Sequence, residues 1–142
     1  MIDTPELKLH FDVTDRTIEG SGGPYLEWFQ VQVNASTPGF TAEIEWAVMP
    51  KEIQIFRDAL TQMNKLLPDT IAELKSVEPG IELRLKLGTK GQIDGEFLIA
   101  NRFRDPEGAV LQGSFGFDQS YLPKIISEVD SLLSYPARSI GA

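Results

Sequence analysis

Apolar and polar residues alternate through most of this chain, and this alternation is the feature that most restricts its fold. A period of two residues is typical of strands that bury one face. The alternating segments are residues 7–13, 29–33, 40–48, 81–87, 93–99 and 111–117. The sequence Ser-Thr-Pro-Gly at residues 36–39 joins two of them and predicts an antiparallel hairpin. Turns are also predicted at residues 20–24 and 105–108, and the pattern at residues 71–77 is ambiguous.

Two segments change to the period of an α-helix. The first follows Pro50, a residue suited to the first turn of a helix, and Pro68 is predicted to end it. The second includes Pro123 in its first turn, and Asp118 or Ser120 can cap its exposed N–H groups. The apolar stripes are Ile53, Phe56, Leu60, Met63 and Leu67 in the first segment, and Leu122, Ile125, Ile126, Val129, Leu132 and Leu133 in the second. Each stripe predicts an amphipathic helix with one buried face.

These elements together predict an α+β fold. Their order is three strands, a helix, about four strands and a second helix. This order favours a curved antiparallel meander of about six to seven strands, packed on one face by the two helices. A length of 142 residues is that of one domain. We therefore expect a single domain over residues 1–142, with its core at about 7–133 and a loose tail at 134–142.

The composition argues against several classes of function. The chain has 21 acidic and 13 basic residues and a formal net charge of −8. Nucleic acids and anionic membranes require a basic face, so neither is expected as a partner. The chain has no cysteine, which excludes disulfides and thiolate metal sites. Residues 1–6 are acidic and have no apolar core, so we expect no signal peptide, and no apolar run is long enough to cross a bilayer. We expect a cytoplasmic protein, monomeric or weakly homo-oligomeric, whose charge fits a basic protein partner but also serves solubility.

Candidate catalytic residues are few. His10 is the only histidine and lies on the polar side of its predicted strand, so we expect no catalytic site, metal or cofactor. Glu43 and Glu45 project from one strand face about 7 Å apart, and Asp94 and Glu96 repeat this arrangement. Paired carboxylates act as acid and base in glycoside hydrolases only within a cleft that separates their pKa values. Both pairs are interpreted as solvated strand faces or contacts for a basic partner, and no enzymatic activity is predicted.

Trp28 is a candidate aromatic contact. If Phe29, Val31 and Val33 face the core, then Leu26 and Trp28 face the other side of the sheet. Apolar side chains on a polar face indicate a contact patch. The alternative is that a loop or the N-terminal strand covers them.

The segment at residues 115–123, which reads FGFDQSYLP, combines an aromatic strand with the cap of a helix. The other notable segments are the hairpin leading into Trp46, the helical FRDAL at residues 56–60, and the strands at 81–85 and 91–97. With these features the chain resembles the WapI-type immunity family, small cytoplasmic bacterial proteins linked to polymorphic-toxin systems. The resemblance covers roughly residues 25–133. It implies a protein that binds and inhibits a cognate toxin domain, often a nuclease and therefore often basic.

The same motif has a complete structural interpretation. Phe115 and Phe117 are expected to fill the core, Asp118 to cap the helix, and Tyr121 and Leu122 to anchor its first turn. The motif therefore supports the fold more strongly than the function, and it transfers no binding residue.

The leading hypothesis is a non-enzymatic immunity protein that binds a basic toxin domain, because opposite electrostatic fields steer association. Its candidate partner-binding residues are Trp28, Glu43, Glu45, Asp94 and Glu96. One alternative is a domain that binds or converts a small ligand in a pocket between the sheet and the helices. Another is an assembly module that uses an open sheet edge.

Overall fold

The computed structural model of the chain describes residues 1–19, 27–101 and 107–140. The turn predicted at residues 20–24, Leu26, and the first half of the turn predicted at 105–108 lie outside these ranges. The described residues form nine strands, two α-helices and one 3₁₀ helix. In chain order they are β1 (Ile2–Asp3), β2 (Lys8–Glu19), β3 (Glu27–Thr37), β4 (Phe40–Val48), α1 (Pro50–Asn64), β5 (Ile71–Lys75), β6 (Ile81–Leu87), β7 (Gln92–Ala100), β8 (Val110–Asp118), the 3₁₀ helix η2 (Gln119–Tyr121), α2 (Leu122–Leu133) and β9 (Arg138–Ile140).

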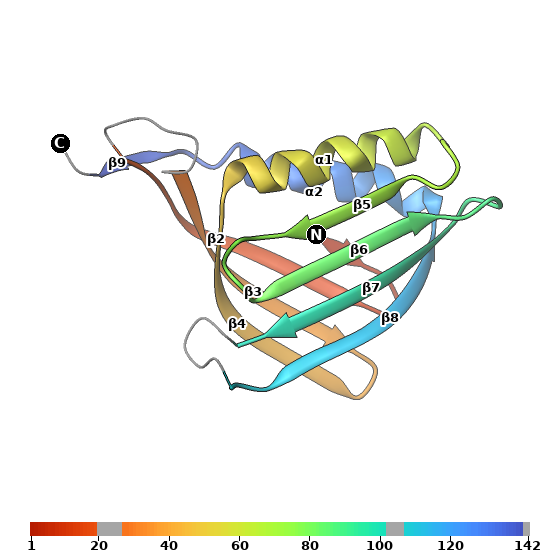
Figure 1. Cartoon of the computed structure of the whole chain (residues 1–142), viewed down its shortest axis with the longest axis horizontal. Coiled ribbons are helices and arrows are strands. Elements are labelled where there is room, and N and C mark those ends of the chain that lie inside the picture. Colours follow the sequence, from red (N-terminus) through yellow and green to blue (C-terminus); the bar gives the residue numbers. More distant parts are fainter. Residues whose placement is uncertain (20–26, 102–106, 141–142) are drawn as a thin grey trace.

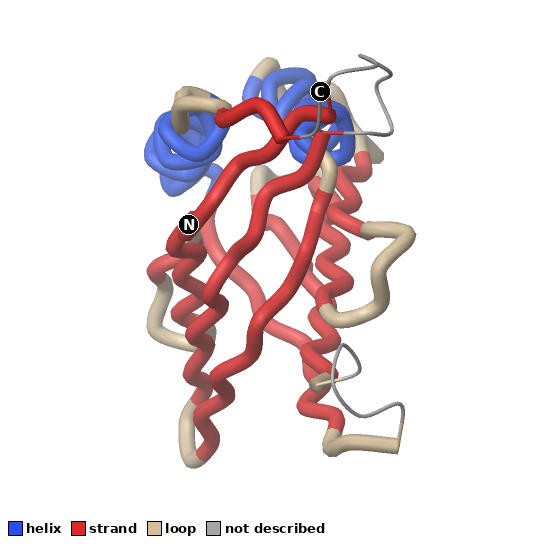
Figure 2. Tube along the Cα trace, turned by 90° about the vertical axis from the view of Figure 1, so that its left-hand side faces the viewer, coloured by secondary structure: helices blue, strands red, loops and turns tan. Residues whose placement is uncertain are grey.

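The strands form two sheets. In the five-stranded sheet, β1, β2, β3 and β4 run antiparallel in that order and β9 pairs in parallel with β2. In the four-stranded sheet, β5, β6, β7 and β8 form an antiparallel meander. Figures 1 and 2 show the strands in two layers, with α1 and α2 lying together across one end. The α+β class is confirmed. The predicted meander is divided into two sheets, since β4 and β5 do not pair.

A single hydrophobic core joins both sheets and both helices. Trp46 on β4 is 1% exposed and lies at the centre of this packing. Its indole Nε1–H donates a hydrogen bond of 3.0 Å to the carbonyl of Glu78, which lies between β5 and β6. Gly80 makes this approach possible, since a Cβ atom there would lie 2.7 Å from the indole ring. The buried indole therefore links the two sheets.

Helix α1 ends earlier than the sequence predicts. It begins at Pro50 as expected, but its last residue is Asn64 and not a residue next to Pro68. The chain then enters the left-handed region at Leu66, with φ of 60°. Leu67, which was predicted to lie on the buried stripe, is 48% exposed. That prediction is wrong because the chain leaves the helix before the stripe reaches this residue.

The segment at residues 115–123 forms the aromatic strand and helix start that its pattern predicts, but Asp118 caps the 3₁₀ helix η2 and not α2, which has no side-chain cap. Phe115 and Phe117 are buried, and Tyr121 packs edge-on against Phe117 with ring centroids 6.0 Å apart. The Asp118 carboxylate accepts a hydrogen bond of 3.0 Å from the backbone N–H of Ser120. Hydrogen bonds from Ser120 lower the pKa of Asp118. The motif therefore caps η2 and directs the chain into α2.

A break in the register of β2 places Arg16 between the five-stranded sheet and α2. Val13 pairs with Val31 and Asp15 with Gln30, so one extra residue is inserted between them. A shift of one residue exchanges the two faces of a strand. Arg16 therefore faces inward, beside Phe29, where its Nη1 donates to the carbonyls of Leu133 and Tyr135 at 2.8 and 2.9 Å.

Both terminal segments pack on the rest of the structure. Met1 and Ile2 are 7% and 1% exposed, so the core begins before residue 7. The segment expected to be a loose tail contains β9, which pairs with β2. An ion pair of 2.6 Å between Arg138 and Asp15 joins the same two strands. A tail of small and polar residues gives no apolar pattern from which this strand is predicted.

Candidate partner-binding surface

The five candidate residues lie on two different sheets. Trp28 is on β3, and Glu43 and Glu45 are on β4, all with side chains on the outer face of the five-stranded sheet. Asp94 and Glu96 are on β7, on the outer face of the four-stranded sheet. The inner faces of the two sheets share one core, so their outer faces point away from each other. The two carboxylate pairs therefore do not form one site.

The outer face of the five-stranded sheet carries an acidic patch formed by Asp12, Glu43 and Glu45. All three side chains are exposed. Asp12 and Glu45 lie opposite Gln32 on either side of β3, so their backbones are about 10 Å apart. Gln32 also donates a hydrogen bond of 2.9 Å to Glu43. Glu43 and Asp12 form no ion pair with the described residues. The patch is a group of carboxylates on β2 and β4 with the amide side chain of Gln32 on β3 between Asp12 and Glu45.

Trp28 lies on the same face, nearer the helices. It is half-buried and pairs with Thr17 across β2. Trp28 is four positions before Gln32 along β3, so their backbones are about 13 Å apart. The alternation of β3 places the indole on the outer face together with the amides of the acidic patch. Trp28 therefore lies beside the patch rather than within it.

The outer face of the four-stranded sheet mixes both signs of charge. Glu96 lies opposite Arg84 and Asp94 lies opposite Lys86 across β6 and β7. Arg84 is also 3.3 Å from the carboxylate of Glu73. Cross-strand pairs of opposite charge stabilise a sheet and reduce its external field. Asp94 and Glu96 are therefore part of a balanced surface and not of an acidic one.

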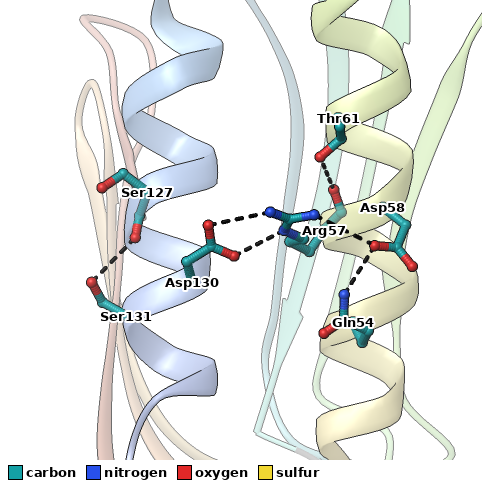
Figure 3. Close-up of polar contacts among 7 residues, drawn as sticks. All are labelled: Gln54, Arg57, Asp58, Thr61, Ser127, Asp130 and Ser131. Carbon is teal, nitrogen blue, oxygen red and sulfur yellow. Dashed lines mark hydrogen bonds and ion pairs between the residues drawn. The ribbon is translucent and has the colours of Figure 1, made fainter.

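The layer of two helices also balances its charges internally. The Arg57 guanidinium on α1 donates to Asp130 on α2, with an Nε to Oδ1 distance of 2.8 Å (Figure 3). It also lies 3.8 Å from Asp58, whose carboxylate accepts a hydrogen bond from Gln54. The hydrogen bond from Arg57 to Asp130 raises the pKa of Arg57. The contact between Arg57 and Asp130 holds α1 and α2 together. These polar side chains therefore have a structural role that requires no bound ligand.

His10 lies on the outer face of the five-stranded sheet, in line with Asn34 and Glu43. Its side chain is exposed. No group of three or more histidine, aspartate or glutamate side chains among the described residues could hold a metal ion. The core shared by the sheets and helices is packed with apolar side chains such as Phe56 and Leu60, each 0% exposed. One open groove lies on the outer face of the four-stranded sheet, and two others lie where β2 meets α2, each lined by His10 and Glu128.

Asp12 was not among the residues selected from the sequence. Its position in an alternating strand predicts an exposed side chain, but not which strand lies beside it. Only the register of β2 and β3 brings it into line with Glu45. A prediction of strand pairing would have been needed to find it.

The fold and this surface define a small acidic α+β protein that presents a charged sheet face. Residues 1–136 match the model of the Immunity protein WapI-like family, and the chain belongs to this family. The match confirms the resemblance noted in the sequence and extends it to the N-terminal strands. A comparison with curated proteins gives no match. In the part of the chain that the structure describes, no helix has the length and apolar character needed to cross a membrane.

Proposed function

We propose that this protein is a cytoplasmic immunity protein that binds a cognate toxin domain and neutralises it without enzymatic activity. The observation that carries the proposal is the family match over residues 1–136. The net charge of −8 favours a basic partner. The absence of cysteine fits a reducing compartment.

The outer face of the five-stranded sheet is the proposed binding surface. Asp12, Glu43 and Glu45 supply negative charge there, and the β3 residues that pair with them are Gln32 and Asn34. Trp28 supplies a neighbouring half-buried aromatic ring, the side-chain type that most often anchors protein interfaces. Asp94 and Glu96 are less favoured because Lys86 and Arg84 lie opposite them.

Co-expression with the C-terminal domain of a toxin encoded beside the gene tests the function. Rescue of growth together with a co-purifying complex is the expected result. A toxin that still kills, with no complex between the purified proteins, would refute the proposal. The readout includes physical binding because a catalytic antidote would rescue growth without forming a stable complex.

A pair of double variants tests the surface. Glu43→Lys with Glu45→Lys should weaken toxin binding at least 10-fold and reduce its dependence on salt, because charges opposed across an interface cost several kcal/mol. Asp94→Lys with Glu96→Lys is the matched control, since it changes the net charge equally on the opposite sheet. Trp28→Ala tests the neighbouring aromatic contact. Equal losses of affinity in the two double variants would show that only overall charge matters and would eliminate the surface.

A further inference from the structure

Strand β8 is an open edge of the four-stranded sheet. It pairs with β7, and no other strand of the described residues pairs with it. Backbone groups of an edge strand point alternately toward the sheet and away from it. The N–H of Gly116 points away, because it donates to the carboxylate of Glu6. The carbonyl of Ala109 and the N–H of Gln119 point toward the neighbouring strand, since they bond Asn101 and Gly91.

This alternation identifies three residues with free backbone groups. Val110, Gln112 and Ser114 lie six, four and two residues before Gly116 and share its orientation. Their N–H and C=O groups form no hydrogen bond with another described residue. All three side chains are exposed. The edge therefore offers three donors and three acceptors in extended geometry over five residues.

The chemistry of this edge differs from that of the others. Proteins usually protect edge strands with charged residues or proline, which prevent pairing with another strand. The other described edge strands carry charges, such as Asp3 on β1, Glu43 on β4, Glu73 on β5 and Arg138 on β9. From Val110 to Phe117, β8 has no charged residue and no proline. Among the described residues, the side chain of Glu6 covers the end of this edge at Gly116.

We propose that β8 pairs antiparallel with β8 of a second copy of this chain, about a two-fold axis at Gln112. In this register Gln112 faces its own copy and Val110 faces Ser114 of the other copy. Each facing pair exchanges two hydrogen bonds, so about six form in all. The two four-stranded meanders then become one continuous sheet. This inference is independent of the proposed toxin interface, which lies on the other sheet.

Charge favours a second copy as the occupant. Two molecules that each carry a net charge of −8 repel unless the surface where they meet is uncharged. The facing residues are Val110, Gln112 and Ser114, which place no like charges opposite each other. A basic partner strand would gain no attraction from this edge. The buried area of one strand pair is well below that of a stable dimer, so the association should depend on concentration.

Charge substitution at Gln112 tests the two-fold axis. Wild-type protein at increasing concentration should show a dimer in sedimentation equilibrium. Gln112→Lys alone and Gln112→Glu alone should lose the dimer, because each places like charges opposite each other on the axis. An equimolar mixture of the two should recover a dimer that contains one copy of each. Recovery in the mixture also shows that both variants are folded.

Gln30 supplies the matched control, since it is an exposed glutamine on the central strand β3. Gln30→Lys should dimerise as the wild type does. A second measurement uses the absence of native cysteine: Gln112→Cys should form a disulfide-linked dimer under mild oxidation and Gln30→Cys should not. A wild type that stays monomeric up to its solubility limit, or a Gln112→Lys variant that still dimerises, would overturn the proposal.

Discussion

Replacing Arg16 with methionine is expected to destabilise the fold by about 3 kcal/mol. The Arg16 guanidinium contacts the Glu27 carboxylate at 2.6 Å and donates to the carbonyls of Leu133 and Tyr135 at the end of α2. Its centre also lies 5.0 Å from the centroid of the Phe29 ring. One side chain therefore joins β2, β3 and the C-terminal end of α2.

The magnitude follows from the partial burial of this cluster. Removing one partner of a buried ion pair costs about 3–5 kcal/mol. Here the side chains of Arg16 and Glu27 retain 19% and 24% exposure, which lets water replace part of the lost contact. Methionine keeps the apolar stem but leaves Glu27 without its cation and the two carbonyls without their donor. A loss of about 3 kcal/mol corresponds to a decrease in Tm of about 10 °C for a chain of this size.

Urea denaturation followed by circular dichroism measures this loss, with the slope of the transition checked for two-state behaviour. Arg84→Met is the matched control, because the ion pair of Arg84 with Glu73 is exposed and should contribute less than about 1 kcal/mol. A double-mutant cycle with Glu27→Gln isolates the pair. The reasoning fails if Arg16→Met costs no more than the control, or if the coupling to Glu27 is close to zero.

Two further predictions concern the packing of Phe115 on β8 and the helix cap formed by Asp118. Gly95→Ala should cost about 1–3 kcal/mol in urea denaturation, because the new Cβ would lie 2.4 Å from the Phe115 ring; Gly116→Ala, with 3.5 Å to its nearest atom, should cost far less. Asp118→Asn tests the pH dependence of the cap. The pKa of Asp118 is lower in the folded state than in the unfolded state. The carboxylate therefore stabilises the fold at pH values above its unfolded pKa, and this stabilisation is lost as the pH falls through the folded pKa. The stability difference between wild type and Asp118→Asn should therefore vanish in acid, and a difference that persists there would contradict this account.

Local patterns in the sequence were sufficient to predict most elements of the fold. Each of β6, β7 and α2 buries one face. The spacing of apolar residues within each segment is enough to predict this burial. The division into two sheets could not be predicted this way, because it depends on which strands pair. The inward turn of Arg16 was missed for the same reason, since it follows from an extra residue in the register with β3.

The candidate surface shows the same limit. Alternation correctly predicted that Glu43, Glu45, Asp94 and Glu96 are exposed. It did not predict that Lys86 and Arg84 lie opposite the second pair, or that the two pairs are on different sheets. The charge of a sheet face depends on the residues of several neighbouring strands, so the sequence of one strand does not predict it.

The pairing of β9 with β2 also has a consequence for the order in which the chain can fold. Asp15 and Arg138 are 123 residues apart in sequence, and their ion pair closes one of the longest loops in the molecule. Strands β5 to β8 pair only with sequential neighbours and need no distant segment. Contacts between distant residues form slowly because the ends of a long loop must first meet. During synthesis, the four-stranded sheet is therefore free to assemble as soon as β8 leaves the ribosome, whereas the five-stranded sheet stays incomplete until residue 140 has emerged.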